Sequence, residues 1–355
     1  MSFKKETPLA NAVFWAARKG NLALLQLLLN SGRVDADCKD CYGTTALMVA
    51  SYSGHHECAR ELVMQGADIN LQRETGSTAL FFAAQQGHDD IVKFLFEFGA
   101  STEFRTKDGG TALSAASQYG HSKVVETLLK NGANIHDQLN DGATSLFLAA
   151  QQGHVTVVRQ LISSGAKVNH LREDGTAPLW MAAQMGHSEV VKVLLLRGAD
   201  RDADRKDGST ALFKAAFKGQ NKVIEELLKF SPSLGLLKNG STALHAAAMG
   251  GNPKTVSLLL GANADPFVAN NVGITNVKSE VRVTNCQGNS SMQIKHEKNT
   301  TNVVRMCTQF TQNQRKDCQS NGKMSVVFVF LSDGLYLLQM YLLQMFCSRV
   351  LQCHY

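Results

Sequence analysis

One short pattern recurs through about three quarters of this 355-residue chain and constrains its fold more than any other feature. The tripeptide Thr-Ala-Leu, or a close variant, returns every 33 residues, and the last interval is 32. In five copies Gly-His follows, with its glycine seven residues after the leucine. The leucines that mark the seven copies are Leu47, Leu80, Leu113, Leu146, Leu179, Leu212 and Leu244. A fixed period of this length is typical of solenoids, because no single unit can bury its own apolar face.

Each copy predicts a pair of helices. Thr78 is a suitable N-cap, and Leu80 and Ala83 begin an apolar helical face that Gly87 ends. A second apolar helical stretch follows and ends at Gly99, a typical C-cap glycine. A degenerate first copy precedes the seven, so we expect an array of about eight units plus a truncated ninth over residues 7–275.

The unit resembles the ankyrin repeat in its Thr-Pro-Leu-His, Ala-Ala, Gly-His, Val-Val, Leu-Leu, Gly-Ala and Asp-Gly positions. The resemblance implies an all-α solenoid of helix-turn-helix units with β-hairpin fingers. Its role would be to bind proteins, with no known chemistry. The sequence departs from the family in keeping the tetrad histidine only at His245 and the proline only at Pro178. Apolar residues mostly replace that histidine, so we expect few tetrad hydrogen bonds and apolar packing in their place.

In this family the finger tips and the outward face of each first helix form a concave binding surface. The outward positions lie two and five residues after each signature leucine, and they hold apolar groups and a ladder of glutamines. An exposed apolar stripe favours an interaction surface, although these side chains could also simply pack along the groove or reflect repeat duplication. The expected partner-binding residues are Val49, Tyr52, Phe82, Gln85, Gln118, Leu148, Gln151, Met181, Gln184 and Phe217.

Charges of both signs occupy the predicted fingers, for example Lys107-Asp108 and Arg172-Glu173-Asp174. They are explained either as solvated turns whose carboxylates support the backbone or as electrostatic selection of a partner.

We expect no metal, no cofactor and no catalysis. The Gly-His histidines come from successive units roughly 8–10 Å apart, too far for one zinc ion. The spacing of Cys38, Cys41, His55 and Cys58 superficially suits zinc, but the next unit builds the same loop from Leu71 and Glu74. No phosphate-binding loop, dinucleotide fingerprint or nucleophile elbow is present.

The net charge and the cysteine content limit which kinds of partner and which compartment we expect. The net charge is +6, and the segment from residue 276 contributes five of these charges (nine basic minus four acidic residues), so the array lacks the basic bias of a nucleic-acid binder. The first residues contain no secretory signal, so we expect a monomer in the cytoplasm with its eight cysteines reduced.

The C-terminal segment does not follow the repeat. Residues 276–323 are polar and predict a disordered linker. Residues 324–355 form an apolar tail interrupted by Asp333-Gly334, which could be a membrane anchor, an amphipathic or partner-binding helix, or a variant terminus without a role. The sequence therefore favours a non-catalytic scaffold or adaptor that binds a protein or peptide segment through its concave groove. The alternative is an ankyrin protein tethered to a membrane by its tail.

Overall fold

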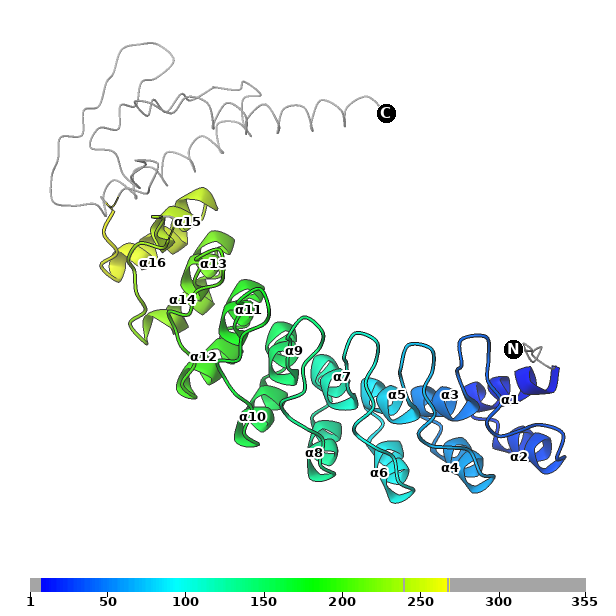
Figure 1. Cartoon of the computed structure of the whole chain (residues 1–355). Helices are drawn as coiled ribbons and strands as arrows, with labels where there is room; N and C mark the ends of the chain where they lie inside the picture. The colour runs from blue at the N-terminus through cyan, green and yellow to red at the C-terminus, as the bar shows by residue number, and fades with distance from the viewer. Residues whose placement is uncertain (1–7, 239, 267, 269–355) are drawn as a thin grey trace, which may run out of the picture. The chain divides into compact units, whose positions relative to one another are not determined.

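The computed structural model describes residues 8–238, 240–266 and 268. Within this part of the chain there are sixteen helices in eight consecutive pairs (Figure 1). They belong to two units, one ending at Ser233 and the other beginning at Leu234. The predicted linker 276–323, the apolar tail 324–355 and the truncated ninth repeat near Val277 lie outside the described residues.

Two rows of helices build the first unit, and within it the row of first helices lies on the inner side of the curve (Figure 1). The first-helix row consists of α1 (Pro8–Lys19), α3 (Ala46–Ser53), α5 (Ala79–Gln86), α7 (Ala112–Tyr119), α9 (Ser145–Gln152), α11 (Pro178–Met185) and α13 (Ala211–Lys218). The second-helix row consists of α2 (Leu22–Asn30), α4 (His56–Met64), α6 (Asp89–Glu97), α8 (Ser122–Lys130), α10 (Val155–Ser163), α12 (Ser188–Leu196) and α14 (Asn221–Leu228). Each helix packs on the next of its own row and on its pair partner.

The second unit contains one described pair, α15 (Ala243–Met249) and α16 (Pro253–Gly261), which pack on each other. It holds the one tetrad histidine expected from the sequence. The Thr242 hydroxyl caps α15 by accepting from the His245 N–H, and the Thr242 N–H donates to Nδ1 of His245.

The signature threonine begins the helix as predicted. The Thr78 hydroxyl oxygen accepts a hydrogen bond from the Phe81 N–H at 3.2 Å, which satisfies one of the free donors at the helix start. Gly87 ends α5 with φ of 82°, a left-handed conformation that favours glycine. At the start of α11, Ala177 cannot cap, but Pro178 at the first helical position needs no partner for a backbone N–H.

The core is formed by leucines and alanines that repeat from unit to unit. Leu80 is 1% exposed, while Ala83 and Ala84 are fully buried between adjacent first helices. Alanine at these positions allows neighbouring helices to approach closely, so the repeated leucines of both rows can fill one continuous apolar layer.

The fingers contain less regular strand structure than the family resemblance implies. In the described residues they form isolated antiparallel bridges, Lys39 with Thr45, Gln138 with Thr144 and Asp204 with Thr210, and no extended hairpin strand. Backbone bonds also join one finger to the next, as where the Glu74 N–H donates to the Tyr42 carbonyl at 2.9 Å.

A ladder of histidines ties neighbouring units together. The Nε2 atom of His121 lies 2.9 Å from the Gln85 carbonyl oxygen in the preceding unit, and His154 and His187 make the equivalent bonds to Gln118 and Gln151. Because a carbonyl can only accept, Nε2 carries the proton. His55 and His88 bond the Arg18 and Tyr52 carbonyls in the same way.

The lost tetrad histidines are replaced by more than the predicted apolar packing. The Arg172 guanidinium lies 5.8 Å from the ring centre of Phe147, and Arg205 lies 5.2 Å from that of Trp180. The indole N–H of Trp180 also donates to the Ser209 carbonyl at 3.1 Å. Cation–π contacts and this hydrogen bond therefore connect consecutive units where the family uses histidine.

Candidate functional site

The ten residues expected to bind a partner all lie on first helices, from α3 to α13. Tyr52 and Phe217 are 50% and 37% exposed. Val49, Phe82, Met181 and the four glutamines are half-buried. The structure thus brings nine of the ten to the outward side of the first-helix row, which we call the groove face.

Leu148 is the exception. It is 8% exposed and packs in a cluster with Ala143 and Phe147, against which Leu139 and Met181 also lie. The expectation that Leu148 is exposed was therefore wrong, because the large neighbouring side chains of its own and adjacent units cover it.

The fifth position after each signature leucine forms a row along the groove face. Its six side chains are Tyr52, Gln85, Gln118, Gln151, Gln184 and Phe217, and we call them the slot row. The backbone carbonyls of the first four are the ones bound by the histidine ladder. Histidine bonds therefore fix the backbone from which most of the slot-row side chains project.

Aromatic rings cluster at the N-terminal end of the groove face. The rings of Tyr52 and Phe82 meet edge to face with 6.0 Å between their centroids, and the Gln85 amide lies 3.4 Å from the Tyr119 hydroxyl. Tyr119 and Met185, 50% and 47% exposed, were not among the predicted residues. Both occupy the sixth position after the leucine, and that neighbouring position was the signal that could have identified them.

The floor of the groove face carries no charge over most of its length. The five helices α3, α5, α7, α9 and α11, each of eight residues, contain no Asp, Glu, Lys, Arg or His. The next first helix, α13, contains Lys214 and Lys218. The Lys214 ammonium lies 5.6 Å from the ring centre of Trp180 and 5.7 Å from that of Phe217.

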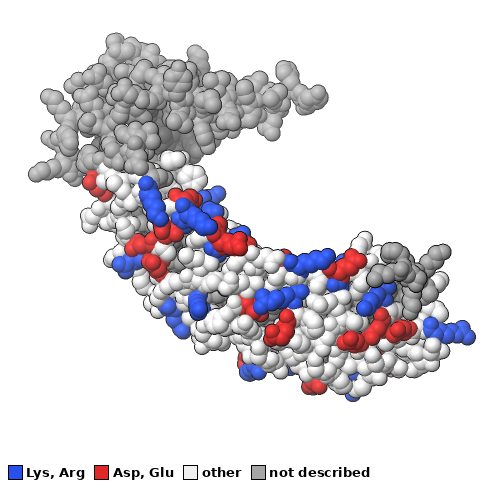
Figure 2. Space-filling view, viewed as in Figure 1, with Lys and Arg blue, Asp and Glu red and all other residues white. Residues whose placement is uncertain are grey.

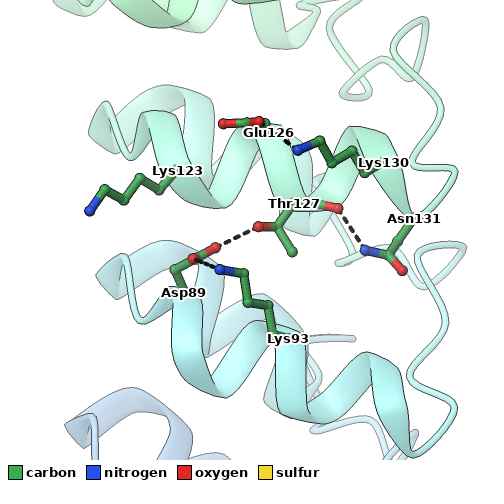
Figure 3. Close-up of a pocket in the computed structure, with 7 residues that line it drawn as sticks. All are labelled: Asp89, Lys93, Lys123, Glu126, Thr127, Lys130 and Asn131. Atoms are coloured by element: carbon green, nitrogen blue, oxygen red, sulfur yellow. Dashed lines mark hydrogen bonds and ion pairs between the residues drawn. The ribbon is translucent and has the colours of Figure 1, made fainter.

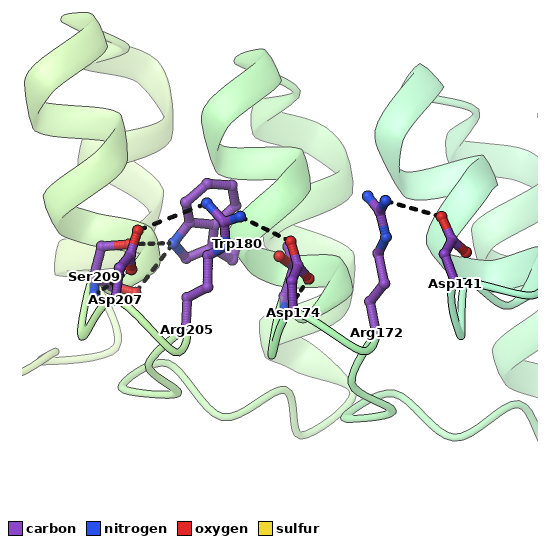
Figure 4. A network of polar contacts seen from close by, with 8 residues as sticks. Asp141, Arg172, Asp174, Trp180, Arg205, Asp207 and Ser209 are labelled. Atoms are coloured by element: carbon purple, nitrogen blue, oxygen red, sulfur yellow. Dashed lines mark hydrogen bonds and ion pairs between the residues drawn. The ribbon is translucent and has the colours of Figure 1, made fainter.

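The finger charges pair with one another between units (Figure 4). Arg172 contacts Asp141 at 2.9 Å, and Arg205 contacts Asp174 at 2.8 Å and Asp207 at 3.6 Å. Burial by itself would raise the pKa of Asp207, but hydrogen bonds from Ser209 and the charges of Arg205 and Lys214 outweigh it and lower that pKa.

Charges of opposite sign also lie next to each other on the face of the molecule seen in Figure 2. The paired finger charges favour a structural role for these residues over free electrostatic selection of a partner. On that view their contribution to stability is small, because exposed ion pairs are typically worth at most about 1 kcal/mol.

A polar hollow of about 430 Å³ lies on the second-helix row, between α6 and α8 (Figure 3). Asp89 accepts from the Thr127 hydroxyl at 2.6 Å and pairs with Lys93 at 2.8 Å. Burial would raise the pKa of Asp89, but these two partners outweigh it, so the pKa is lowered and the group stays ionised. An ionised carboxylate held by a lysine is a poor proton donor. The arrangement is therefore typical of a network of surface ion pairs and not of a catalytic site.

The four residues considered for zinc lie in different surroundings in the structure. Burial, with the nearby charges of Asp35 and Asp37, raises the pKa of the Cys38 thiol to about 11. Cys41 is exposed and Cys58 is buried. His55 instead bonds the Arg18 carbonyl. In the part of the chain that the structure describes, no three His, Cys, Asp or Glu side chains are grouped to hold a metal ion.

The same part of the chain contains no helix that is both long enough and apolar enough to cross a membrane.

Comparison with known families agrees with this fold. The family model of ankyrin repeats (three copies) matches residues 4–73, 63–138, 131–204 and 179–270, so the chain belongs to the ankyrin repeat family. Repeats of this family generally mediate protein–protein interaction and are typically non-catalytic. The chain is also similar to a solved structure, the human ASB11 ankyrin repeat domain, at 31% identity and a TM-score of 0.57, over 63% of this chain and 97% of that one.

Particular relatives match over shorter stretches. Ankyrin repeat domain-containing protein 29 of Danio rerio is 93% identical over 74 residues, and its Homo sapiens counterpart is 81% identical over 73 residues. Each match covers 21% of this chain, and 25% and 24% of the respective relatives. The human oxysterol-binding protein-related protein 1 is 42% identical over 60 residues, which are 17% of this chain and 6% of that relative. The matched segments thus span about a quarter or less of these relatives' own lengths.

Proposed function

We propose that this protein is a non-catalytic scaffold or adaptor that binds a segment of a partner protein along the groove face. The observation that carries this proposal is the uncharged floor formed by α3, α5, α7, α9 and α11. Packing does not require it, because Tyr52 and Tyr119 are half exposed and a charged side chain could be solvated there. Exposed rings on an uncharged surface are typical of protein-binding faces.

The monomeric state and cytoplasmic location expected from the sequence belong to the same proposal. The non-catalytic role is supported by the second-row hollow between α6 and α8, where Asp89 is bound by both Lys93 and Thr127. A nucleophile or general base needs a side chain that is available to a substrate.

The test replaces exposed apolar residues on the two rows with glutamate. The groove-face variant is Tyr52→Glu with Phe217→Glu, and the matched control is Met64→Glu with Leu196→Glu on the second-helix row, where the native side chains are 57% and 63% exposed. Proximity labelling in cells, with quantitative mass spectrometry, is expected to show a set of partners lost from the groove-face variant and kept by the control. Equal labelling by both variants, with both folded by circular dichroism, would reject the groove as the binding surface.

A further inference from the structure

The slot row has an order that suggests what it binds. An exposed ring stands at each end, Tyr52 on α3 and Phe217 on α13, and the four positions between them are glutamines. Histidine bonds hold the backbone carbonyls of Tyr52, Gln85, Gln118 and Gln151. A partner therefore meets a regular series of amides on a backbone fixed before binding, which lowers the cost of ordering them.

The spacing of this series selects a backbone conformation. Neighbouring packed helices lie about 8–10 Å apart, so successive slots repeat at about that distance. A polyproline II chain has three residues per turn and rises about 3.1 Å per residue, so it presents the same face about every 9.3 Å. In a β-strand successive side chains point to opposite faces, so residues three apart, at about 10 Å, do not share a face. An α-helix has a pitch of about 5.4 Å, and its backbone groups are already bonded to one another.

The chemistry of the slots fits the same conformation. A polyproline II backbone has no internal hydrogen bonds, so its carbonyl and N–H groups are free to pair. A glutamine amide can both donate and accept. Within the described residues the side chains of Gln118, Gln151 and Gln184 make no hydrogen bond, and that of Gln85 makes a long one of 3.4 Å to Tyr119. These amides are free to bind the backbone of a partner.

The charges along the groove face indicate which residues a bound segment can contain and in which direction it lies. The floor from α3 to α11 offers no counter-ion, so a charged residue buried there would be costly. Lys214, beside Phe217 at the far end of the row, lies over two rings; its charge acts on Asp207, but the two make no ion pair within the described residues. An acidic group that reaches this end would find an available cation that is partly shielded from water.

We propose, as a refinement that rests on the protein-binding role above, that the slot row binds a proline-rich segment of a partner protein in the polyproline II conformation. One glutamine contacts every third residue, the rings of Tyr52 and Phe217 pack on prolines near the two ends, and an acidic residue pairs with Lys214. Six slots give five steps of about 8–10 Å, so the bound segment has about 13–16 residues.

The test uses fluorescein-labelled peptides of about 15 residues, with proline at every third position and alanine elsewhere. One version is uncharged, and two carry a single glutamate, at the amino or the carboxyl end. In a fluorescence anisotropy titration with the full chain, one glutamate version is expected to bind best. A matched peptide with glycine in place of proline is expected to bind about tenfold more weakly, because it must lose more conformational freedom.

Three variants locate the binding site. Gln118→Ala with Gln151→Ala should weaken binding about tenfold through the loss of two hydrogen bonds. The matched control, Gln86→Ala with Gln152→Ala, removes the neighbouring glutamines of α5 and α9 and should leave the affinity unchanged. Lys214→Gln should remove the preference for the glutamate peptide, so that this peptide and the uncharged one bind the variant equally.

Each other outcome overturns the proposal. Equal binding of the proline and glycine peptides would exclude polyproline II recognition, and equal loss in both glutamine pairs would exclude the slot row. If no proline peptide binds while the Tyr52→Glu, Phe217→Glu variant still loses its cellular partners, the groove function stands and this inference fails.

Discussion

The two rows of the first unit are built from the same repeat but differ on their outward sides. Both rows bury leucine, alanine and valine toward the shared core. Every second-row helix from α4 to α14 carries at least one charged residue, whereas the first-row helices from α3 to α11 carry none. The outward side of the second-helix row is charged, as is typical of a solvent-exposed surface, and it contains ion pairs such as that of Lys93 with Asp89 at 2.8 Å. Since core packing is common to both rows, it does not explain why the groove face lacks charge.

The largest expected effect comes from a charge placed within the first-helix row at Leu148. Leu148→Glu puts a carboxylate into the apolar cluster that Leu148 forms with Phe147 and Ala143. The free energy of unfolding should fall by about 3–5 kcal/mol, because a charge is moved from water into apolar surroundings. Urea denaturation followed by circular dichroism measures this change.

The matched variant is Tyr52→Glu on the same row, where the side chain is half exposed and the expected change is within about 0.5 kcal/mol. If Leu148→Glu were as stable as Tyr52→Glu, the Leu148 side chain would have to be exposed in solution. Leu148 would then belong to the groove face.

Leu148 also shows how far the sequence could predict the site. The repeat determines which way a side chain points from its helix, and so the helix pairs, their caps and nine of the ten outward residues were predicted. It does not determine which neighbours cover that side chain. The histidine ladder was expected to be structural, but its partners are carbonyls such as that of Gln85, 36 residues before His121. A contact between units of this kind depends on how they stack, which a local pattern does not contain.

The next largest effect concerns Gly87, the glycine that ends α5 before α6 begins. At Gly87 a Cβ atom would lie 2.5 Å from Nδ1 of His121, whereas at Gly99 no atom lies within 4 Å, and the two glycines have nearly the same φ, 82° and 87°. Gly99→Ala should cost about 1–2 kcal/mol from the left-handed backbone alone. Gly87→Ala should cost about 2–4 kcal/mol, because the ring must also leave the Gln85 carbonyl.

Urea midpoints of the two glycine variants measure that difference, and the double variant Gly87→Ala, His121→Ala sharpens it. Removal of the ring should relieve the clash but not restore the lost bond. Equal midpoints for Gly87→Ala and Gly99→Ala would show that the histidine does not fix the slot row.

A smaller effect is expected where the first-helix row meets the fingers. Trp180→Phe removes the N–H that donates to the Ser209 carbonyl at 3.1 Å and leaves a smaller ring under Arg205. The expected loss of stability is about 1–3 kcal/mol. Ser209→Ala is the comparison: it keeps that carbonyl, removes the Ser209 hydroxyl that lies 3.2 Å from the same indole nitrogen, and should cost less. Hydrogen exchange at the backbone amides of α11 and α13 measures both, and equal losses would mean that the indole bond does not connect these units.

The smallest effect tests whether the ion pairs of the fingers and those of the second-helix row contribute differently to stability. The pKa of Asp207, in a finger, and that of Asp89, on the second-helix row, are both lowered in the folded protein. A lowered folded pKa means that the unfolded chain binds more protons in acid. The stabilisation is therefore fully present above the unfolded value of about 3.9, and it is lost as the pH falls through the folded pKa.

Asp207→Asn and Asp89→Asn should each destabilise the protein at pH 7 by at most about 1 kcal/mol. The difference from the unmodified protein should shrink at pH 3 and below, and also in high salt. Urea midpoints at pH 7 and pH 3 measure this change. If both variants lose stability by the same amount and with the same pH dependence, the two carboxylates have the same local structural role. The groove face would then be distinguished by its uncharged floor and not by its ion pairs. A difference that grows in acid at Asp207 alone would instead mean that its lowered pKa does not stabilise the fold.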